Sequence, residues 1–193
     1  DFAFNSKAEA AVAQALEIAP TDVPTRKLQA SLHLTFHRFS EALQLGKELQ
    51  KEFPNDSFVY GVLTDANAEL GNYPEAVAAA QKMVDLKPNM ESYARVALLR
   101  SLHGDAEGAI EAMKTAARIA VRLAPDKPDG HFWLGANLGG AAEKRPFTKG
   151  VLAIDEIRSS MKKVIEIEPS YQAAAAFDAL AQVELKAPFA GGT

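Results

Sequence analysis

Cysteine is absent from this chain of 193 residues, which excludes disulfides, thiolate metal sites and thiol nucleophiles. Long apolar runs are lacking as well. No stretch approaches the roughly 18 residues of a membrane-spanning helix, so we expect no membrane span. An excess of one charge sign is also missing, because 21 Lys and Arg residues face 25 Asp and Glu residues for a net charge of −4. No basic block interrupts this mixture, and we therefore expect no nucleic-acid partner.

The composition is that of a folded domain. Hydrophobic residues make up 48% and charged residues 24% of the chain, and its length is sufficient for a sizeable core. The sequence begins with Asp1 rather than Met, which predicts a mature form or a fragment. The lack of cysteine fits a reducing and an oxidising compartment equally well, so the cytoplasm and the periplasm both remain open.

Evenly spaced prolines reveal an internal repeat. Pro20, Pro54 and Pro88 are separated by 34 residues each time, and each follows an apolar run with helical patterning. Proline cannot continue a helix and biases the preceding residue away from the helical region of backbone conformation. Each of these prolines is therefore predicted to close a helix.

Alanines follow the same period. Ala8, Ala42 and Ala76 each lie twelve residues before one of the prolines. A small side chain at one fixed point of a helix lets two helices approach closely. Turn signals stand before Ser40 and Glu75, each followed by residues that can start a helix. Each period is therefore predicted to hold two helices.

The segment GNYPEAVAAAQKMVDLKPN, residues 71–89, resembles the tetratricopeptide repeat, a helix–turn–helix unit of 34 residues. The unit starting at Ser57 carries residues typical of the family at Tyr60, Leu63, Gly71, Tyr73, Ala76 and Pro88. The resemblance implies an all-α fold, an α-solenoid of antiparallel helix pairs that wind into a right-handed superhelix.

The repeat predicts one tetratricopeptide-type domain over residues 1–193. Its parts are a half-unit at 5–20, units at 23–54, 57–88, 90–125 and 128–169 with an insertion at 143–152, and a half-unit at 170–186. Because repeat units bury their apolar faces on their neighbours, the two half-units should expose surface. We expect that this surface could support a homo-oligomer.

The C-terminal third also resembles, more loosely, two groups of tetratricopeptide proteins. These are the TatT proteins associated with TRAP transporters and the regulators of microtubule dynamics. The resemblance rests on His131–Gly135, Lys149–Ala153 and Ile165–Pro169. It implies a role in interaction or in holding a ligand rather than in catalysis.

Residues with catalytic or metal-binding chemistry form no complete motif. His33 and His37 have the spacing of a two-histidine metal site but lack an accompanying glutamate, and the repeat places His33 at a packing position and His37 in a turn. The glycines of 135–140 lack the preceding strand and the trailing lysine of a phosphate loop. Hydroxyl residues have no nucleophile elbow or local base. We therefore predict no enzyme, no catalytic residues, no metal and no cofactor.

By the resemblance, the first helix of each unit lines a concave groove. The candidate partner-binding residues there are Lys27, Ser31, Phe58, Val62, Asp65, Arg95, Leu98, Phe132, Trp133 and Tyr171. The best-known groove chemistry of the family is a clamp for a C-terminal carboxylate. Only Lys27 and Arg95 match its five positions, and Glu91 at another would repel a carboxylate, so we reject the clamp.

Trp133, the single tryptophan, leaves two interpretations open. It lines the groove as a binding anchor or packs in the core, and Phe132 takes the other role because neighbouring helical residues point about 100° apart. We predict a non-enzymatic scaffold that binds a peptide or protein segment in its concave groove. The alternative is a small-ligand-binding or transporter-accessory protein with an apolar pocket formed by Trp133, Tyr171 and the insertion at 144–152.

Overall fold

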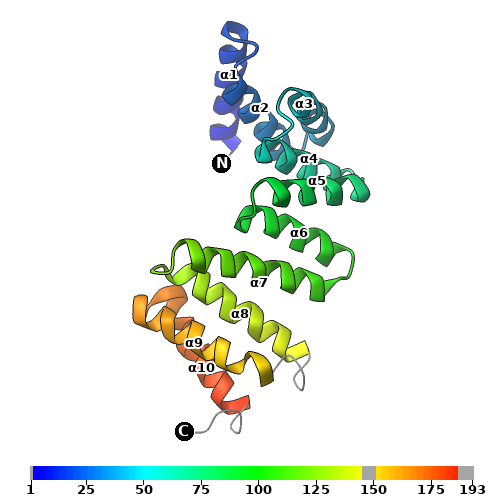
Figure 1. The fold of residues 1–193 in the computed structure, drawn as a ribbon. Helices are drawn as coiled ribbons and strands as arrows, with labels where there is room; N and C mark the ends of the chain where they lie inside the picture. The colour runs from blue at the N-terminus through cyan, green and yellow to red at the C-terminus, as the bar shows by residue number, and fades with distance from the viewer. Residues whose placement is uncertain (1, 145–150, 187–193) are drawn as a thin grey trace. The chain divides into compact units, whose positions relative to one another are not determined.

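Residues 2–144 and 151–186 are described by the computed structural model, and the elements that they form are helices (Figure 1). The ten helices of these residues are α1 (Phe2–Ile18), α2 (Val23–Thr35), α3 (Phe39–Glu52), α4 (Ser57–Glu69), α5 (Tyr73–Leu86), α6 (Met90–Leu102), α7 (Ala106–Leu123), α8 (Pro128–Lys144), α9 (Val151–Ile167) and α10 (Tyr171–Lys186). The all-α prediction is confirmed. No helix among the described residues is long and apolar enough to cross a membrane.

Prolines end the odd-numbered helices as the repeat predicts. The last residue of each lies two positions before a proline, at Ile18, Glu52, Leu86, Leu123 and Ile167. The residue between the helix and the proline is the one whose helical conformation the proline ring disfavours. The periodic prolines therefore set the helix length as well as the helix count.

The helix pairs coincide with the predicted units. Helices α2 and α3, α4 and α5, α6 and α7, and α8 and α9 form the four pairs, while α1 and α10 occupy the two half-units. The predicted insertion at 143–152 stays a prediction; α8 continues to Lys144 and α9 begins at Val151. Residues 145–150 within it lie outside the described residues.

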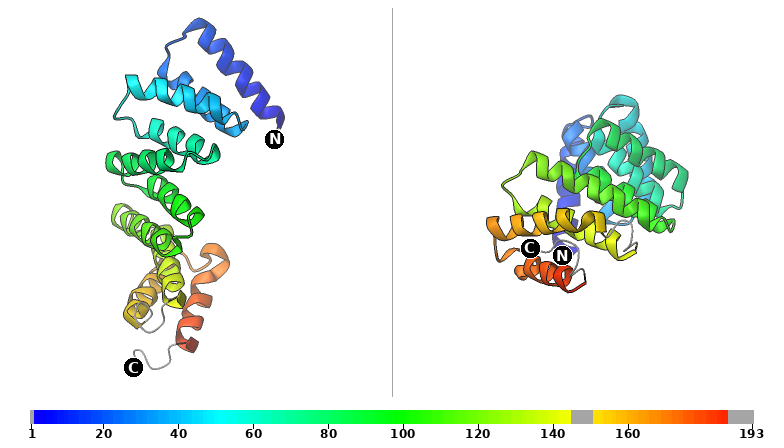
Figure 2. Two further views of the ribbon diagram at one scale, coloured as in Figure 1. Left: turned by 90° about the vertical axis from the view of Figure 1, so that its right-hand side faces the viewer. Right: turned by 60° about the horizontal axis from the view of Figure 1, so that its bottom comes forward.

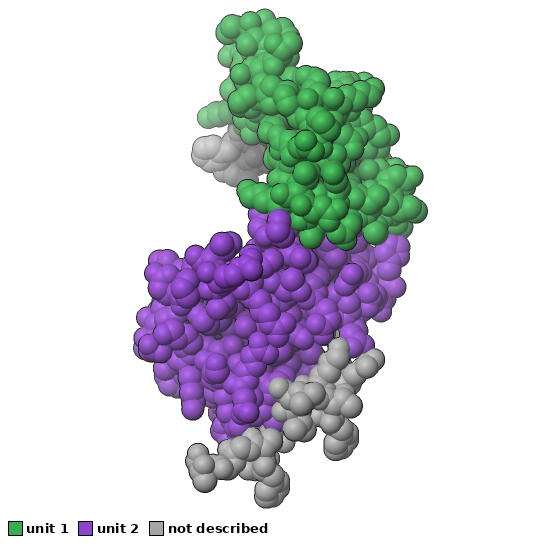
Figure 3. Space-filling view, in the orientation of Figure 1, with its two compact units in different colours: residues 1–87 green, residues 88–193 purple. Residues whose placement is uncertain are grey.

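Two compact units divide the chain, residues 1–87 and residues 88–193 (Figure 3). We call them the N-terminal unit and the C-terminal unit. The prediction of one domain over 1–193 therefore stays a prediction. Within the N-terminal unit each helix packs on the next from α1 to α5, and α2 also contacts α4. Within the C-terminal unit each packs on the next from α6 to α10, and α8 also contacts α10 (Figure 2).

Small residues hold the core of the N-terminal unit together. Ala30 of α2, Ala42 of α3 and Ala66 of α4 are fully buried and pack with Val62 in one cluster. A second cluster joins α3, α4 and α5 and consists of Leu49, Val59, Tyr60, Leu63, Ala79 and Met83. The close helix contacts predicted at Ala42 and Ala76 are confirmed by their complete burial, whereas Ala8 of α1 is half-buried.

The core of the C-terminal unit lies between α7, α8, α9 and α10. Its buried members are Ala117, Leu134, Leu138, Ala153, Ile157, Met161, Val164 and Ala176. Ion pairs cross the surface of the same helices: Arg118 of α7 pairs with Glu156 of α9 at 3.0 Å, and Arg158 of α9 pairs with Glu184 of α10 at 2.7 Å. These pairs link α7 to α9 and α9 to α10 at the surface of the unit.

The turns within helix pairs require a left-handed residue. Gly71 and Gly104 supply it with φ of +78°, and His37 occupies the same place after α2 with φ of +57°. The backbone N–H of His37 donates to the carbonyl of Leu34, as that of Gly71 donates to the carbonyl of Ala68. The prediction that His37 lies in a turn is confirmed, and it occupies a position that favours glycine.

Candidate functional site

Two glycines fix the rotation of α8 about its own axis. A Cβ atom on Gly130 would lie 2.7 Å from the backbone nitrogen of Val121 in α7, and a Cβ atom on Gly135 would lie 2.6 Å from Cε of Met161 in α9. The contact at Gly130 is with backbone, so α8 approaches α7 this closely because Gly130 lacks a side chain, whereas at Gly135 the atom met is the movable end of the Met161 side chain. Leu134 and Leu138 are buried on the same side of the helix.

The opposite side of α8 is exposed. Asp129, Trp133 and Ala136 lie on it at helical spacing, and 43% of the surface of Trp133 is exposed. Of the two interpretations of Trp133, core packing is therefore wrong. Phe132 takes the inner role, because it is half-buried and packs against the core of the C-terminal unit.

The ring of Phe132 contacts both Trp133 and Tyr171. The ring centroid of Phe132 lies 5.4 Å from that of Trp133 and 5.4 Å from that of Tyr171, with interplanar angles of 80° and 66°. Edge-to-face pairs of this kind contribute about 0.5–1.5 kcal/mol each beyond the area that they bury. The structure thus brings together three of the four aromatic residues that the sequence predicted as partner-binding, one of them on α10.

A hydrogen bond joins the two helices at this point. The hydroxyl of Tyr171 donates to Oδ1 of Asp129 at 2.8 Å. Burial, and then this hydrogen bond and the charges of Asp129 and Glu168, raise the pKa of Tyr171. The hydroxyl therefore stays protonated as a donor at neutral pH. We call Asp129, Phe132, Trp133 and Tyr171 together the Trp133 face.

The backbone directly after Tyr171 is left-handed. Gln172, Ala173 and Ala174 have φ of +50°, +55° and +65°, and the regular part of α10 follows them. Each non-glycine residue in this conformation costs on the order of 1 kcal/mol. The turn sets the direction in which α10 leaves Tyr171. Nothing in the sequence predicts it, because the segment contains neither glycine nor asparagine.

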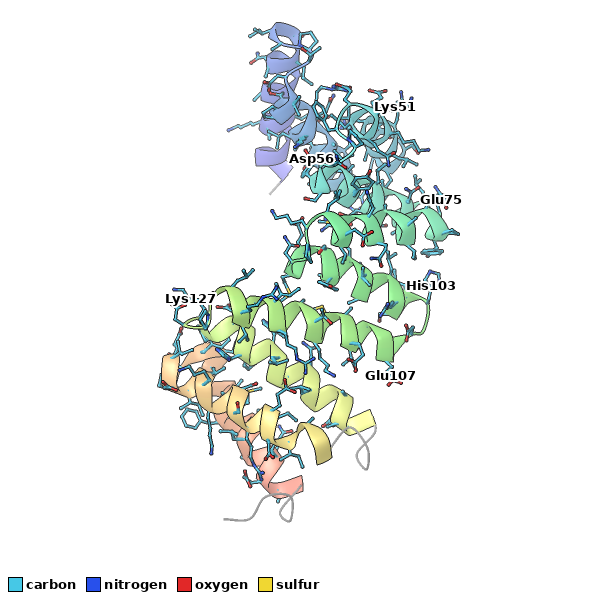
Figure 4. All side chains as sticks on the ribbon, viewed as in Figure 1. Lys51, Asp56, Glu75, His103, Glu107 and Lys127 are labelled. Carbon is cyan, nitrogen blue, oxygen red and sulfur yellow. The ribbon has the colours of Figure 1, made fainter. Side chains whose placement is uncertain are left out.

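In the N-terminal unit the candidate residues interact with one another. The ammonium group of Lys27 on α2 pairs with the carboxylate of Asp56 and lies 5.5 Å from the ring centroid of Phe58. Asp56 precedes α4 (Figure 4). Asp56 also accepts the backbone N–H of Phe58 at 3.0 Å as the cap of α4. Sequence reasoning missed Asp56, although an aspartate directly before an apolar helical run is a capping signal.

Val62 is the predicted site residue that the structure contradicts. Only 3% of its surface is exposed, because it packs with Ala30, Ala42 and Ala66. A Cβ atom on Gly46 of α3 would lie 3.3 Å from Cγ1 of Val62. The small residues of α2 and α3 therefore close over Val62, and it is unavailable to a partner.

The remaining candidates are described within their own units. Ser31 and Asp65 are half-buried in the N-terminal unit. In the C-terminal unit, Arg95 of α6 pairs with Glu91 one turn away at 3.2 Å, and Leu98 is 56% exposed. Their roles in binding stay predictions.

The two histidines of the N-terminal unit, His33 and His37, lie at the end of α2 and in the turn after it. The part of the chain that the structure describes contains no group of three or more potential metal ligands. His33 is half-buried, and its Nδ1 atom is buried without a hydrogen-bond partner among the described residues. Burial, and then the charge of Arg38, lower the pKa of His33, against the opposing effect of Glu41 and Glu9.

Solved structures with the same architecture are tetratricopeptide proteins. The thermophilic tetratricopeptide-repeat protein TTC0263 of Thermus thermophilus is 20% identical, with a TM-score of 0.56 over 93% of this chain and 92% of its own. The crystal structure of MamA is 19% identical, with a TM-score of 0.53 over 82% of this chain and 85% of its own. Human IFIT1, solved as a dimer with m7Gppp-AAAA, is 15% identical, with a TM-score of 0.53 over 95% of this chain and 42% of its own.

No family model matches the chain, and no curated protein matches it in sequence. The similarity in structure shows that the chain has the tetratricopeptide-repeat fold, as its prolines and alanines predicted. The looser resemblance of its C-terminal third to TatT proteins and to regulators of microtubule dynamics stays a prediction.

Proposed function

We propose that the chain is a non-enzymatic interaction scaffold, and that its C-terminal unit binds a segment of another protein on the Trp133 face. The observation that carries this proposal is the exposure of Trp133, the only tryptophan of the chain, on a surface that the aromatic rings of Phe132 and Tyr171 hold in place. Tryptophan is among the residue types most enriched in the energetically dominant centres of protein interfaces.

The rigidity of the face favours binding. A side chain already fixed by ring contacts loses little rotamer freedom when a partner covers it, and ordering costs of about 0.5–1.5 kcal/mol per side chain are avoided. Beyond Trp133, α8 presents the small residues Ala136 and Gly140. A Cβ atom on Gly140 would meet no atom within 4 Å, so a partner segment has room along the helix.

The candidate partner-binding residues of the N-terminal unit are less accessible to a partner than Trp133. The ammonium group of Lys27 is already paired with Asp56, and Val62 is buried. A partner would have to break an existing ion pair there, whereas Trp133 is accessible as it stands.

Nucleic acid is the other class of macromolecule to consider. The structure of IFIT1 contains m7Gppp-AAAA, so a tetratricopeptide fold does not exclude nucleic acid, and the composition of this chain is the only argument against it. The alternative of an apolar small-ligand pocket between Trp133, Tyr171 and residues 144–152 stays a prediction, since most of the insertion lies outside the described residues. Self-association through the half-units also stays a prediction.

Affinity capture from the native organism tests the proposal. The full chain and its Trp133→Ala variant serve as baits, and Phe177→Ala is the matched control because Phe177 is another aromatic residue of the C-terminal unit and is 50% exposed. We expect Trp133→Ala to lose specific protein partners that Phe177→Ala retains. Circular dichroism verifies that both variants keep their helices. Retention of every partner by folded Trp133→Ala would contradict the proposal.

A further inference from the structure

Charge is distributed unevenly among the helices of the C-terminal unit. Helices α8 and α10 contain four acidic residues, Asp129, Glu143, Asp178 and Glu184, against two lysines, Lys144 and Lys186, which are the last residues of the two helices. The other helices of the unit, α6, α7 and α9, contain the basic residues Arg95, Arg100, Lys114, Arg118, Arg122, Arg158, Lys162 and Lys163. In the turn before α8, the charges of Asp126 and Lys127 cancel one another. The two helices that form the Trp133 face are therefore acidic on balance.

The carboxylate of the Trp133 face has no cationic partner within the described part of the chain. Its side-chain partner there is the neutral hydroxyl of Tyr171, which bonds Oδ1. No lysine or arginine of the described residues pairs with Asp129 or lies over the ring of Trp133. Asp129 and Trp133 are one helical turn apart on the exposed side of α8, so one ligand can contact both.

The N-terminal unit contains the same combination of groups with a cation in place. The ammonium group of Lys27 pairs with Asp56 and lies 5.5 Å from the centroid of the Phe58 ring. A positive charge is attracted by the face of an aromatic ring, most strongly by tryptophan, and a nearby carboxylate adds to the attraction. In the C-terminal unit the ring and the carboxylate are present, and the cation is not supplied by the described residues.

We infer that the Trp133 face binds a positively charged side chain, arginine or lysine, of a partner protein, which lies over the indole ring and pairs with Asp129. This inference rests on the proposed function and adds the chemistry of the partner. Arginine suits the site best, because its planar guanidinium can stack on the indole and bond the open oxygen of the carboxylate at once. The protonated hydroxyl of Tyr171 is neutral, so among the described residues the charge of Asp129 has no cation beside it.

Fluorescence anisotropy with labelled peptides tests the inference on the full chain. The probes are an arginine–glycine–serine peptide, the same peptide with citrulline in place of arginine, a glutamate counterpart and an oligoadenylate RNA. Citrulline keeps the shape of arginine and removes its charge. We expect the arginine peptide to bind at least about fivefold more tightly than the citrulline peptide, and the affinity to fall as salt rises.

Two variants and one control localise the binding. Asp129→Asn keeps an acceptor for the Tyr171 hydroxyl and removes the charge, and Trp133→Leu keeps apolar bulk and removes the aromatic face. Each variant should lower the affinity for the arginine peptide about fivefold or more. Glu75→Gln removes an exposed carboxylate of the N-terminal unit (Figure 4) and should leave the affinity unchanged, which excludes an effect of net charge alone.

The outcomes separate the inference from the proposed function. Equal binding of the arginine and citrulline peptides, tighter binding of the RNA or the glutamate peptide, or no binding of the arginine peptide would each overturn the inference. An affinity that falls equally in Glu75→Gln and Asp129→Asn would do the same. The proposed function falls only if Trp133→Ala keeps every captured partner, a result that does not depend on the peptides.

Discussion

Val62 and Trp133 occupy the same position, the sixth, in the repeats of the N-terminal and C-terminal units, yet 3% of Val62 and 43% of Trp133 is exposed. Val62 is covered because Ala30, Ala42 and Gly46 let α2 and α3 close over it. Trp133 is held outward because two glycines of α8 turn the other side of that helix to the core. The register of a repeat thus predicts the helix face on which a residue lies. The size of the neighbouring side chains determines what fraction of its surface is exposed.

The two units also differ in how their charges are paired. Lys27 and Asp56 neutralise one another beside Phe58, whereas the described residues supply no cation for Asp129 beside Trp133. A similar set of groups therefore contributes to stability in the N-terminal unit and is accessible to a ligand in the C-terminal unit. The types of residue alone do not distinguish the two sites, because each contains an aromatic ring and a carboxylate.

The largest expected effect tests the contrast in burial. Val62→Asp places a charge in a closed apolar cluster and should lower the free energy of unfolding by more than about 3 kcal/mol. Trp133→Asp should lower it by less than about 2 kcal/mol, because the new carboxylate reaches water. Urea denaturation followed by circular dichroism measures both. Equal losses would show that the two residues are equally buried.

Turn glycines provide the second comparison. Gly71 and Gly104 have positive φ and open space around the missing Cβ, so Gly71→Ala and Gly104→Ala should each cost about 1 kcal/mol of stability through backbone conformation alone. His37→Gly should raise stability by up to about 1 kcal/mol, reduced by the loss of the ring contact between His37 and Phe39. Thermal unfolding measures the three variants. A destabilised His37→Gly would mean that the ring contact outweighs the backbone strain.

The contrast in charge pairing predicts a smaller difference. Lys27→Gln removes the partner of Asp56 and the cation over Phe58, and should lower the free energy of unfolding by about 0.5–1 kcal/mol. Asp129→Asn should change it by less than about 0.5 kcal/mol, since the asparagine oxygen still accepts the hydroxyl of Tyr171. Both values come from urea titrations at low and high salt. A larger loss in Asp129→Asn would show that Asp129 serves the fold rather than a ligand.

Acid should weaken the N-terminal unit slightly through His33. Its pKa in the folded chain is lowered, so below the ordinary value of about 6.5 the unfolded chain binds more protons than the folded chain. The stability due to neutral His33 is fully present above about pH 6.5 and is lost as the pH falls towards the lowered pKa. Hydrogen exchange of α2 at pH 5 and at pH 7.5 measures the change. His33→Leu should remove it, and an unchanged pH dependence in that variant would assign the effect to other groups.

Much of the fold could be predicted from the sequence because prolines and alanines act locally. Pro20, Pro54, Pro88, Pro125 and Pro169 each lie two residues after the end of a helix, so these prolines mark where the odd-numbered helices from α1 to α9 end. The left-handed backbone at Gln172–Ala174 could not be predicted, since these residues have ordinary helix-forming side chains. Tyr171, the residue directly before this segment, contacts Phe132 and Asp129, and sequence patterns do not report contacts between residues so distant along the chain.

The candidate site was predictable in part for the same reason. Repeat register placed Phe132, Trp133 and Tyr171 on helices that meet, and the structure brings them into contact. Register does not report how closely helices approach, so it could not choose between core and surface for Trp133, and it assigned Val62 to the surface. The pair of Lys27 and Asp56 was missed because the aspartate lies before its helix, outside the groove positions.

Acrylamide quenching of tryptophan fluorescence tests the central claim most directly. Trp133 is the only tryptophan of the chain, so all tryptophan emission comes from the Trp133 face. In the isolated chain we expect efficient quenching, as for a side chain that is nearly half exposed. In complex with a tryptophan-free fragment of a captured partner protein, the quenching constant should fall severalfold. A constant that is unchanged in a saturated complex would show that the partner binds elsewhere.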